Sequence, residues 1–341
     1  MYRYAFALGV LLSLLLFSQS TAAASPPASL AQAQHWAISE GMTSHTVTDL
    51  LQDNHGFLWI ATRNGLQRFD GVLFEHYKAG RQPFHLPSNH IIDLWFNDHQ
   101  LWVATAKGVA YFDYQQNRFY RHPDFTPKDG ILPPQVSRIV ASPSNDLLLL
   151  AEQRLWRATK QDATPLTLSY NGDPLSAIVN IHMGERWIWL AEADGSIYVW
   201  DGQSFDVFKI TQQNPITEKL PAVGFNHILQ RGDEIWLAHD HGLLLLDSDY
   251  RLQQTLDNQT DLNSSTAINR VAYVDSGHLL LGTASGIKIL ETSSSKPAYL
   301  SDQHELSLPP LLLVNAFTVD HLKRLWVGAE NGGLYQFSMR R

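Results

Sequence analysis

The stretch Leu58-Trp59-Ile60-Ala61-Thr62-Arg63-Asn64-Gly65 decides the fold of this chain, because its pattern returns at regular intervals. In each copy a short apolar run ends in an aromatic residue or leucine, then an aliphatic residue, then alanine or glycine. The seven copies are Trp59-Ile60-Ala61, Trp102-Val103-Ala104, Leu149-Leu150-Ala151, Trp189-Leu190-Ala191, Trp236-Leu237-Ala238, Leu280-Leu281-Gly282 and Trp326-Val327-Gly328. Self-similarity at a period of about 40–50 residues is typical of propellers and solenoids.

Each repeat is expected to contain four short strands. In the first unit we predict strands at residues 47–51, 57–62, 66–69 and 73–77, with turns that include Asn64-Gly65 and Asp70-Gly71. These dipeptides accept the positive φ angles of tight hairpins. A unit is therefore an antiparallel meander of the size of a propeller blade, and the chain is predicted to be all-β, a single seven-bladed β-propeller of four-stranded blades.

The repeated tryptophans and small residues have a packing explanation. A blade is covered by a neighbour on both faces, so its central strands are expected to be apolar on both faces. The broad ring fills the wide part of the gap between blades, while alanine or glycine fits where the sheets converge near the axis. We therefore assign the tryptophans to the core and none of them to a ligand.

The ends of the repeat array predict how the ring closes. The last unit supplies three strands, and a segment before the first unit, residues 35–38, matches the fourth strand of unit one. Pairing of this N-terminal segment with the last unit would complete the seventh blade and remove the open sheet edges. The third unit departs from the pattern, since Leu149 replaces the tryptophan and the turn at Glu152-Gln153 is shorter.

The N-terminus has the features of an export signal. Residues 1–24 contain Arg3, an apolar run and Ala22-Ala23-Ala24, which fits a signal-peptidase site, so we predict a signal peptide at 1–24, a leader at 25–34 and the propeller at 35–341. The processed protein is expected in the periplasm and not to span the membrane. Losing Arg3 takes the net charge from −8 to −9 (24 bases against 33 acids), which argues against nucleic acid as a partner. The chain has no cysteine, so a disulfide scaffold is excluded.

One position of the first strands is polar in six of the seven units, although its neighbours are aliphatic. It is occupied by Asp49, Asp93, Arg138, Asn180, His227, Arg270 and Ala316. In a propeller this position lines the central channel, near the mouth where ligands and partners commonly bind. We predict a polar lining that recognises a small molecule or oligosaccharide. The alternative is that these groups satisfy one another or bind channel water.

Histidines and acids are expected near the same mouth. His90, His227, His239 and His241 are candidate ligand-binding residues, together with His45, and Glu192 and Glu330 occupy the turns between second and third strands. His239-Asp240-His241 would suit a metal or a general base, but ordinary turn chemistry explains it as well. A paired-carboxylate site stays open. No nucleophile elbow, phosphate loop or zinc-ligand spacing occurs, and we expect no cofactor and no enzyme activity.

Unit one resembles a known repeat family. The segments Val47 to Asp53, Gly56 to Thr62 and Asn64 to Gly71 are similar to the two-component regulator propeller repeat, and unit two repeats the signature at Leu101 to Thr105. The resemblance implies the periplasmic sensor region of hybrid histidine kinases and diguanylate cyclases. It offers no catalytic residues. The departures are that no second propeller, immunoglobulin-like domain, transmembrane helix or output domain is visible, so the chain is either a separate sensor or the sensor part of a longer protein.

Three functions are compatible with these observations. The first is a periplasmic ligand-sensing or interaction propeller that feeds a two-component or cyclic-di-GMP system, with a membrane sensor kinase or diguanylate cyclase as partner. The second is a propeller lyase or hydrolase, for which His227, His239 and His241 should converge. The third is a structural assembly subunit.

Overall fold

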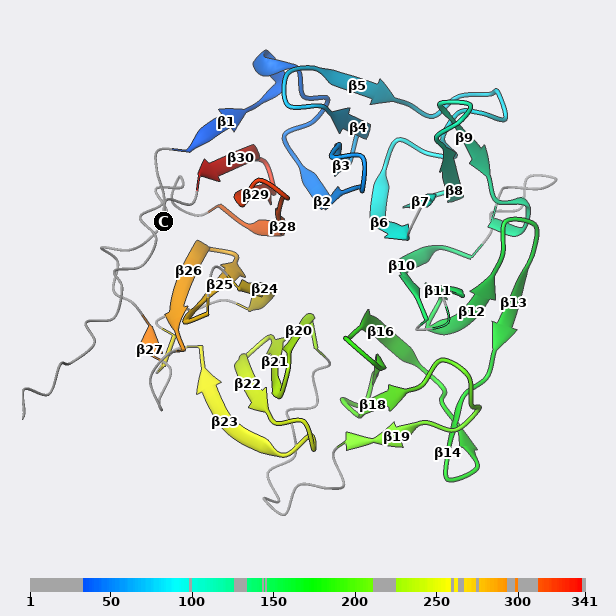
Figure 1. Cartoon of the computed structure of the whole chain (residues 1–341). Helices are drawn as coiled ribbons and strands as arrows, with labels where there is room; N and C mark the ends of the chain where they lie inside the picture. Colours follow the sequence, from blue (N-terminus) through cyan, green and yellow to red (C-terminus); the bar gives the residue numbers. More distant parts are fainter. Residues whose placement is uncertain are drawn as a thin grey trace, which may run out of the picture.

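Seven four-stranded antiparallel sheets form a ring around a central channel (Figure 1). The computed structural model describes residues 33–97, 100–125, 134–142, 144, 146–210, 225–258, 261–262, 267–273, 276–292, 298–299 and 312–338. The predicted signal peptide at 1–24 and nearly all of the predicted leader at 25–34 lie outside the described residues. The predicted all-β, seven-bladed propeller is confirmed.

The strands follow one another through the blades in chain order. Blade one contains β2 (Val47–Gln52), β3 (Leu58–Thr62), β4 (Gly65–Phe69) and β5 (Phe74–Tyr77). Blade two contains β6 (Ile91–Asn97), β7 (Gln100–Thr105), β8 (Gly108–Asp113) and β9 (Arg118–Arg121), and blade three contains β10 (Val136–Ala141), β11 (Leu147–Ala151), β12 (Arg154–Ala158) and β13 (Ala163–Leu166). Blade four contains β16 (Ile178–Met183), β17 (Ile188–Glu192), β18 (Ile197–Trp200) and β19 (Phe208–Lys209).

The remaining blades keep the same order, with the first strand innermost (Figure 1). Blade five contains β20 (His227–Arg231), β21 (Glu234–His239), β22 (Gly242–Leu246) and β23 (Leu252–Asp257), and blade six contains β24 (Ile268–Tyr273), β25 (His278–Thr283), β26 (Gly286–Glu291) and β27 (Ala298–Tyr299). Blade seven contains β28 (Val314–Val319), β29 (Arg324–Ala329), β30 (Gly333–Ser338) and β1 (Gln34–Trp36). Short elements outside the blades are the 3-10 turns η1 (Ile38–Glu40) and η2 (Pro123–Phe125) and the hairpin of β14 (Ser169–Tyr170) and β15 (Asp173–Pro174).

The N-terminal strand closes the ring, as predicted. β1 pairs antiparallel with β30, with His35 opposite Tyr335, and takes the outermost place in the last blade. The strand ends at Trp36, two residues earlier than expected, because the chain turns into η1, where a Glu40 carboxylate oxygen accepts the Ala37 N–H at 2.8 Å. The Trp36 ring lies 5.2 Å from the ring of Trp326 in blade seven and 5.7 Å from that of Phe69 in blade one. Trp36 therefore also packs across the seam between first and last blades.

The hydrophobic core is divided among the gaps between neighbouring blades. Seven clusters of buried side chains each combine residues of two adjacent sheets, and one of them joins Val47 and Leu50 of blade one to Trp326 of blade seven. Trp59, Trp189, Trp236 and Trp326 are fully buried, which confirms their core assignment. A Cβ atom at Gly328 would lie 2.3 Å from Cγ1 of Val47. The small residue is thus required by the close approach of the sheets.

Blade three keeps the architecture despite its divergent sequence. β11 and β12 are joined by a two-residue turn in which Glu152 and Gln153 both have positive φ, 48° and 64°. Blade one joins β3 to β4 through two residues as well, Arg63 and Asn64, so the shorter turn expected in blade three is not found and the four-stranded sheet is unchanged.

Candidate functional site

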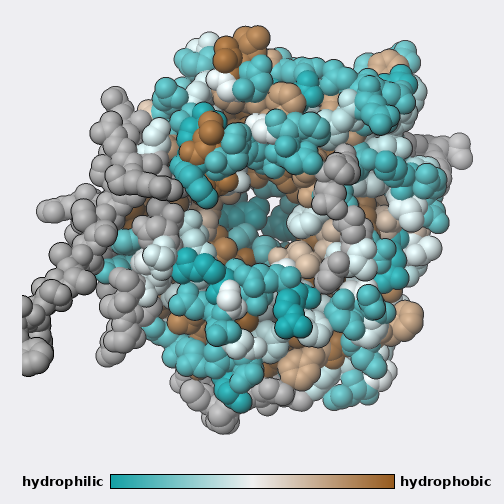
Figure 2. Space-filling view, viewed as in Figure 1, coloured by the Kyte–Doolittle hydropathy of each residue, from teal (hydrophilic) through white to brown (hydrophobic). Residues whose placement is uncertain are grey.

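A polar cavity of about 530 Å³ lies at one mouth of the central channel. Its walls come from all seven blades, through the beginnings of the first strands and the turns between second and third strands, as predicted for this face. The lining residues are Thr48, Arg63, His90, Ile92, Arg138, Asn180, Asn226, Asn269, Arg270, Leu313, Asn315 and Glu330. Figure 2 shows an opening at the centre of the ring with hydrophilic residues within it. The cavity has the size of a site for a small ligand.

A β-bulge shapes the wall of this cavity in six of the seven blades. The pairing of first and second strands shifts register immediately before Asp49, Asp93, Arg138, Asn180, Arg270 and Ala316. A bulge bends the strand and re-aims side chains. In β24 two consecutive residues, Asn269 and Arg270, therefore line the cavity, where regular alternation would offer one.

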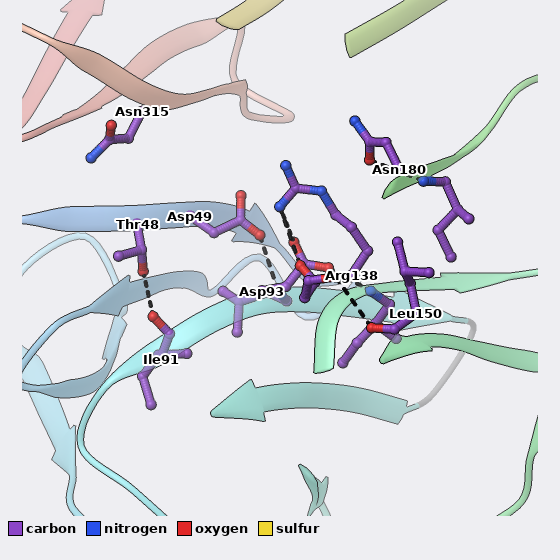
Figure 3. A network of polar contacts seen from close by, with 12 residues as sticks. Thr48, Asp49, Ile91, Asp93, Arg138, Leu150, Asn180 and Asn315 are labelled. Atoms are coloured by element: carbon purple, nitrogen blue, oxygen red, sulfur yellow. Dashed lines mark hydrogen bonds and ion pairs between the residues drawn. The ribbon is translucent and has the colours of Figure 1, made fainter. Parts of the chain in front are cut away.

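The two predicted aspartates hold neighbouring blades together. An Asp49 oxygen accepts the N–H of Leu94 in blade two at 3.0 Å, and an Asp93 oxygen accepts the N–H of Ile139 in blade three at 2.6 Å (Figure 3). Both residues are buried, at 8% and 6% exposure. Their carboxylates thus satisfy backbone donors of the neighbouring blade, which is the mutual satisfaction considered as the alternative to ligand binding.

The two predicted arginines cover these carboxylates from the cavity side. Arg138 Nη1 lies 3.7 Å from Asp93 Oδ1, and Arg270 Nη2, from blade six, lies 3.5 Å from Asp49 Oδ1. Burial raises the pKa of Asp93 above its ordinary value; the Arg138 guanidinium opposes this shift and the Asp49 carboxylate adds to it. Burial lowers the pKa of Arg270, and Asp49 opposes that shift. The four groups therefore form one interacting charge cluster across the channel.

A ring of amide and hydroxyl groups was missed by the sequence analysis. Asn226, Asn269 and Asn315 precede the predicted polar position by one residue and donate to main-chain oxygens of the next blade, Ile268, Val314 and Val47. Thr48 Oγ1 donates to the Ile91 oxygen in the same way, at 2.9 Å (Figure 3). The Asn315 bond to Val47 O, at 2.8 Å, links blade seven to blade one. The signal was present as polar residues one position earlier. The register shifts that accompany Thr48, Asn269 and Asn315 have no clear sequence mark.

The predicted histidines do not gather at one point. His227 and His182, on the neighbouring first strands β20 and β16, have ring centroids 4.8 Å apart, and burial lowers the pKa of His182 to about 3 and that of His227 well below its usual range. His227 is paired with Ala238, so His239, one residue further, points to the other face of the sheet. The His239 and His241 rings are 6.2 Å apart, and burial lowers the pKa of His239 to about 4.

The remaining candidates also separate. His90 is exposed and lines the cavity. His45, beside blade one, is also exposed but is not among the lining residues. Glu330 pairs with Arg63 at 3.0 Å on the cavity rim, whereas Glu192 accepts the Ser176 N–H and the Tyr198 hydroxyl in blade four. Within the described part of the chain, no group of three or more histidine, aspartate or glutamate side chains is arranged to hold a metal ion.

Of the predicted ligand-binding residues, four therefore line the cavity: His90, Arg138, Asn180 and Arg270. Asp49 and Asp93 contact the two arginines. His227, His239 and His241 do not line the cavity. Asn180 is engaged on both sides of its amide, since it donates to Phe225 O and accepts from Ile181 N. Among the predicted residues, His90, Arg138 and Arg270 thus remain as side chains that can donate to a ligand in the cavity.

The repeat resemblance is confirmed by comparison with family models. The model of the two component regulator propeller matches residues 41–64, which span β2, β3 and the turn that follows. The chain is therefore a seven-bladed propeller that carries a two component regulator propeller repeat in its first blade. No curated protein matches the sequence.

Solved structures of similar fold include signalling proteins and an enzyme. The extracellular domain of the putative hybrid two component system BT3049 from B. thetaiotaomicron matches with a TM-score of 0.67 and 20% identity over 90% of this chain and 42% of that chain. The extracellular domain of the putative one component system BT4673 from the same organism matches with a TM-score of 0.64 and 19% identity, over 87% and 38%. A streptogramin B lyase structure matches with a TM-score of 0.66 and 10% identity, over 93% and 100%. At these identities the likeness shows the fold, and the chain spans less than half of the two signalling domains.

In the residues that the structure describes, no helix has the length and apolar character needed to cross a bilayer.

Proposed function

We propose that this chain is an exported propeller that senses a ligand or binds a partner and feeds a membrane signalling system of the two-component or cyclic-di-GMP type. The observation that carries the proposal is the repeat match in blade one, at residues 41–64. It is supported by the fold shared with extracellular domains of putative two component and one component systems. The partner we propose is a membrane sensor kinase or a diguanylate cyclase.

The channel mouth is the proposed sensing surface. All seven blades contribute to its cavity, so a ligand bound there contacts the whole ring at once. Loops that converge on a rigid scaffold are the usual place for binding residues. A change at this mouth can thereby alter the face offered to a signalling partner without any change in the blade cores.

The proposal is tested by two measurements on the exported full-length chain. The first is recovery from the periplasmic fraction followed by a pull-down from native membranes, which should retain a sensor kinase or cyclase. The second is a thermal-shift screen with sugars, peptides and small metabolites. Recovery from the cytoplasm, or a pull-down that retains neither class of enzyme, would contradict the proposal.

We also propose that the mouth binds its ligand without converting it. The support is the arrangement of the histidines named for the lyase or hydrolase alternative, because His227 and His239 lie on opposite faces of their sheet. The test is to incubate each ligand found by the screen with the protein and to follow it by mass spectrometry. Turnover that is lost in His227→Gln would favour the enzyme alternative.

A further inference from the structure

The guanidinium groups at the channel mouth differ in how fully their donors are used. Arg63 contacts the Glu330 carboxylate at 3.0 Å, at hydrogen-bond distance. In the described residues, Arg138 reaches Asp93 at 3.7 Å and Ser137 O at 3.4 Å, and Arg270 reaches Asp49 at 3.5 Å and Asn315 O at 3.3 Å. Each guanidinium has five N–H donors. Arg138 and Arg270 thus bring loosely bound donors to the cavity.

The aspartates beneath these arginines do not need them for hydrogen bonding. Asp49 and Asp93 accept backbone N–H groups at 3.0 and 2.6 Å, shorter than either contact to an arginine. The arginine side chains are also the more accessible partners, with 35% exposure for Arg138 and 21% for Arg270. A molecule that enters the cavity therefore meets the two guanidinium groups before it meets either carboxylate.

The asparagines of the mouth supply acceptors beside these donors. Asn226, Asn269 and Asn315 use their NH₂ groups on main-chain oxygens of the next blade. No donor among the described residues reaches their side-chain oxygens. Because the three residues line the cavity, these oxygens are available to hydroxyl groups of a ligand.

We propose that the mouth cavity binds a small hydroxylated organic anion, whose carboxylate contacts Arg138 and Arg270 and whose hydroxyl groups donate to the amide oxygens of Asn226, Asn269 and Asn315. Charge-assisted bonds from a guanidinium to a carboxylate are the strong interactions available in such a site. The cavity, about 530 Å³, has the volume of a small-ligand site. This inference rests on the proposed sensing role of the mouth and adds the chemical class of the ligand.

The experiment is titration calorimetry of the full-length chain at pH 7 and low salt with D-glucuronate, D-glucose and acetate. D-glucuronate carries both the carboxylate and the hydroxyl groups, whereas each of the other probes carries one of them. We expect D-glucuronate to bind at least about tenfold more tightly than either control, and the preference over D-glucose to shrink as salt is added.

Variants assign the binding to the two arginines. Arg138→Ala and Arg270→Ala are expected to weaken D-glucuronate binding by about tenfold or more, and Arg138→Lys to restore part of it. Arg251→Gln, at an exposed arginine that does not line the cavity, is the charge-matched control and should leave binding within about twofold. Circular dichroism and thermal melting establish that each variant is folded. If Arg270→Ala does not fold, the comparison of Arg138→Ala, Arg138→Lys and Arg251→Gln decides the question alone.

Two results would overturn the inference. One is D-glucose binding as tight as D-glucuronate binding, or no binding of D-glucuronate at millimolar concentration. The other is D-glucuronate affinity that Arg138→Ala leaves unchanged. Either result leaves the signalling proposal to be judged separately by the membrane pull-down, which does not depend on the ligand.

Discussion

The gaps between blades and the mouth of the channel are built from the same repeated strands, but their residues vary differently. In the gaps the tryptophan and the small residue recur, and a side chain at Gly328 would collide with the next blade. At the mouth the aligned position changes from aspartate to arginine, asparagine, histidine and alanine. Because every gap must be densely packed, the same combination of a large ring and a small residue recurs in them. The mouth needs only locally satisfied polar groups, so its chemistry is free to differ from blade to blade.

The largest effect is expected where the ring closes. Deletion of residues 33–42 removes β1, its pairing with β30 and the packing of Trp36 against Trp326. We expect the melting temperature to fall by at least about 10 °C, because an edge and part of a blade interface become exposed. Circular dichroism measures this change. Deletion of residues 25–31 is the control, since it leaves β1 intact; equal melting temperatures for the two deletions would contradict the closure.

A smaller loss is expected from a buried carboxylate in a blade core. Asp320, 2% exposed, accepts the Trp326 indole N–H at 2.8 Å and the N–H groups of Leu322 and Arg324 at 2.9 and 2.8 Å. Asp320→Ala is expected to cost about 3 kcal/mol in urea unfolding, because these donors lose their acceptor. Asp70→Ala, in an exposed turn, is the matched control and should cost less than about 1 kcal/mol. Similar losses of unfolding free energy in Asp320→Ala and Asp70→Ala would contradict the expected difference between a buried and an exposed carboxylate.

The histidines His182 and His227 predict that the free energy of unfolding depends on pH, with an effect of intermediate size. The pKa of His182 is lowered to about 3 and that of His227 also falls, mainly by burial, with the nearby Arg270 and Arg138 adding to it. The pKa of histidine in the unfolded chain is about 6.5. Each neutral imidazole therefore gives its full contribution to stability above that pH, and the contribution is lost as the pH falls below it. Between pH 7 and 5 each histidine should lower the free energy of unfolding by about 1–2 kcal/mol.

The pH effect is isolated by comparison with His182→Gln. Asp93 acts in the opposite direction. Because its pKa is raised, its contribution to stability is largest at low pH and is lost as the pH rises. The free energy of unfolding should therefore fall less between pH 7 and 5 in His182→Gln than in the unmodified chain. Identical pH dependence in both proteins would show that His182 can take up a proton without cost.

The smallest effect is expected on the rim. Arg63 and Glu330 form an ion pair, but the Arg63 side chain is 57% exposed. Solvent screens such a pair, so Arg63→Gln should change the free energy of unfolding by less than about 0.5 kcal/mol. Urea denaturation at low and high salt checks this. A loss above about 1 kcal/mol would show that the rim contributes to stability as the packed gaps between blades do, which would contradict the comparison.

The fold could be predicted because one spatial constraint is repeated in the sequence. Every gap between blades needs a large ring and a small residue at fixed spacing, so the pattern that begins at Trp59-Ile60-Ala61 was visible seven times. The closing strand was also predictable, although η1 ends it two residues early. A local hydrogen bond from Ala37 N–H to Glu40 decides that boundary, and such bonds leave little trace in hydrophobic periodicity.

The candidate site could be predicted only in part. Alternation placed Arg138 and Arg270 at the mouth, but the bulges beside Asn269 and Asn315 depend on register, which a single sequence does not encode plainly. The histidines could not be placed from the sequence either. The lyase or hydrolase alternative required His227, His239 and His241 to converge, whereas the sheet places His227 and His239 on opposite faces.

Disulfide mapping tests the closed ring most directly. The chain has no cysteine, so His35→Cys and Tyr335→Cys introduce a single pair at positions that face each other in the β1–β30 ladder. Opposed residues of an antiparallel pair lie within reach of a disulfide. Closure predicts that mild oxidation of the folded monomer links the peptides that contain positions 35 and 335. Thiols that stay reduced, or that link only between molecules, would contradict it.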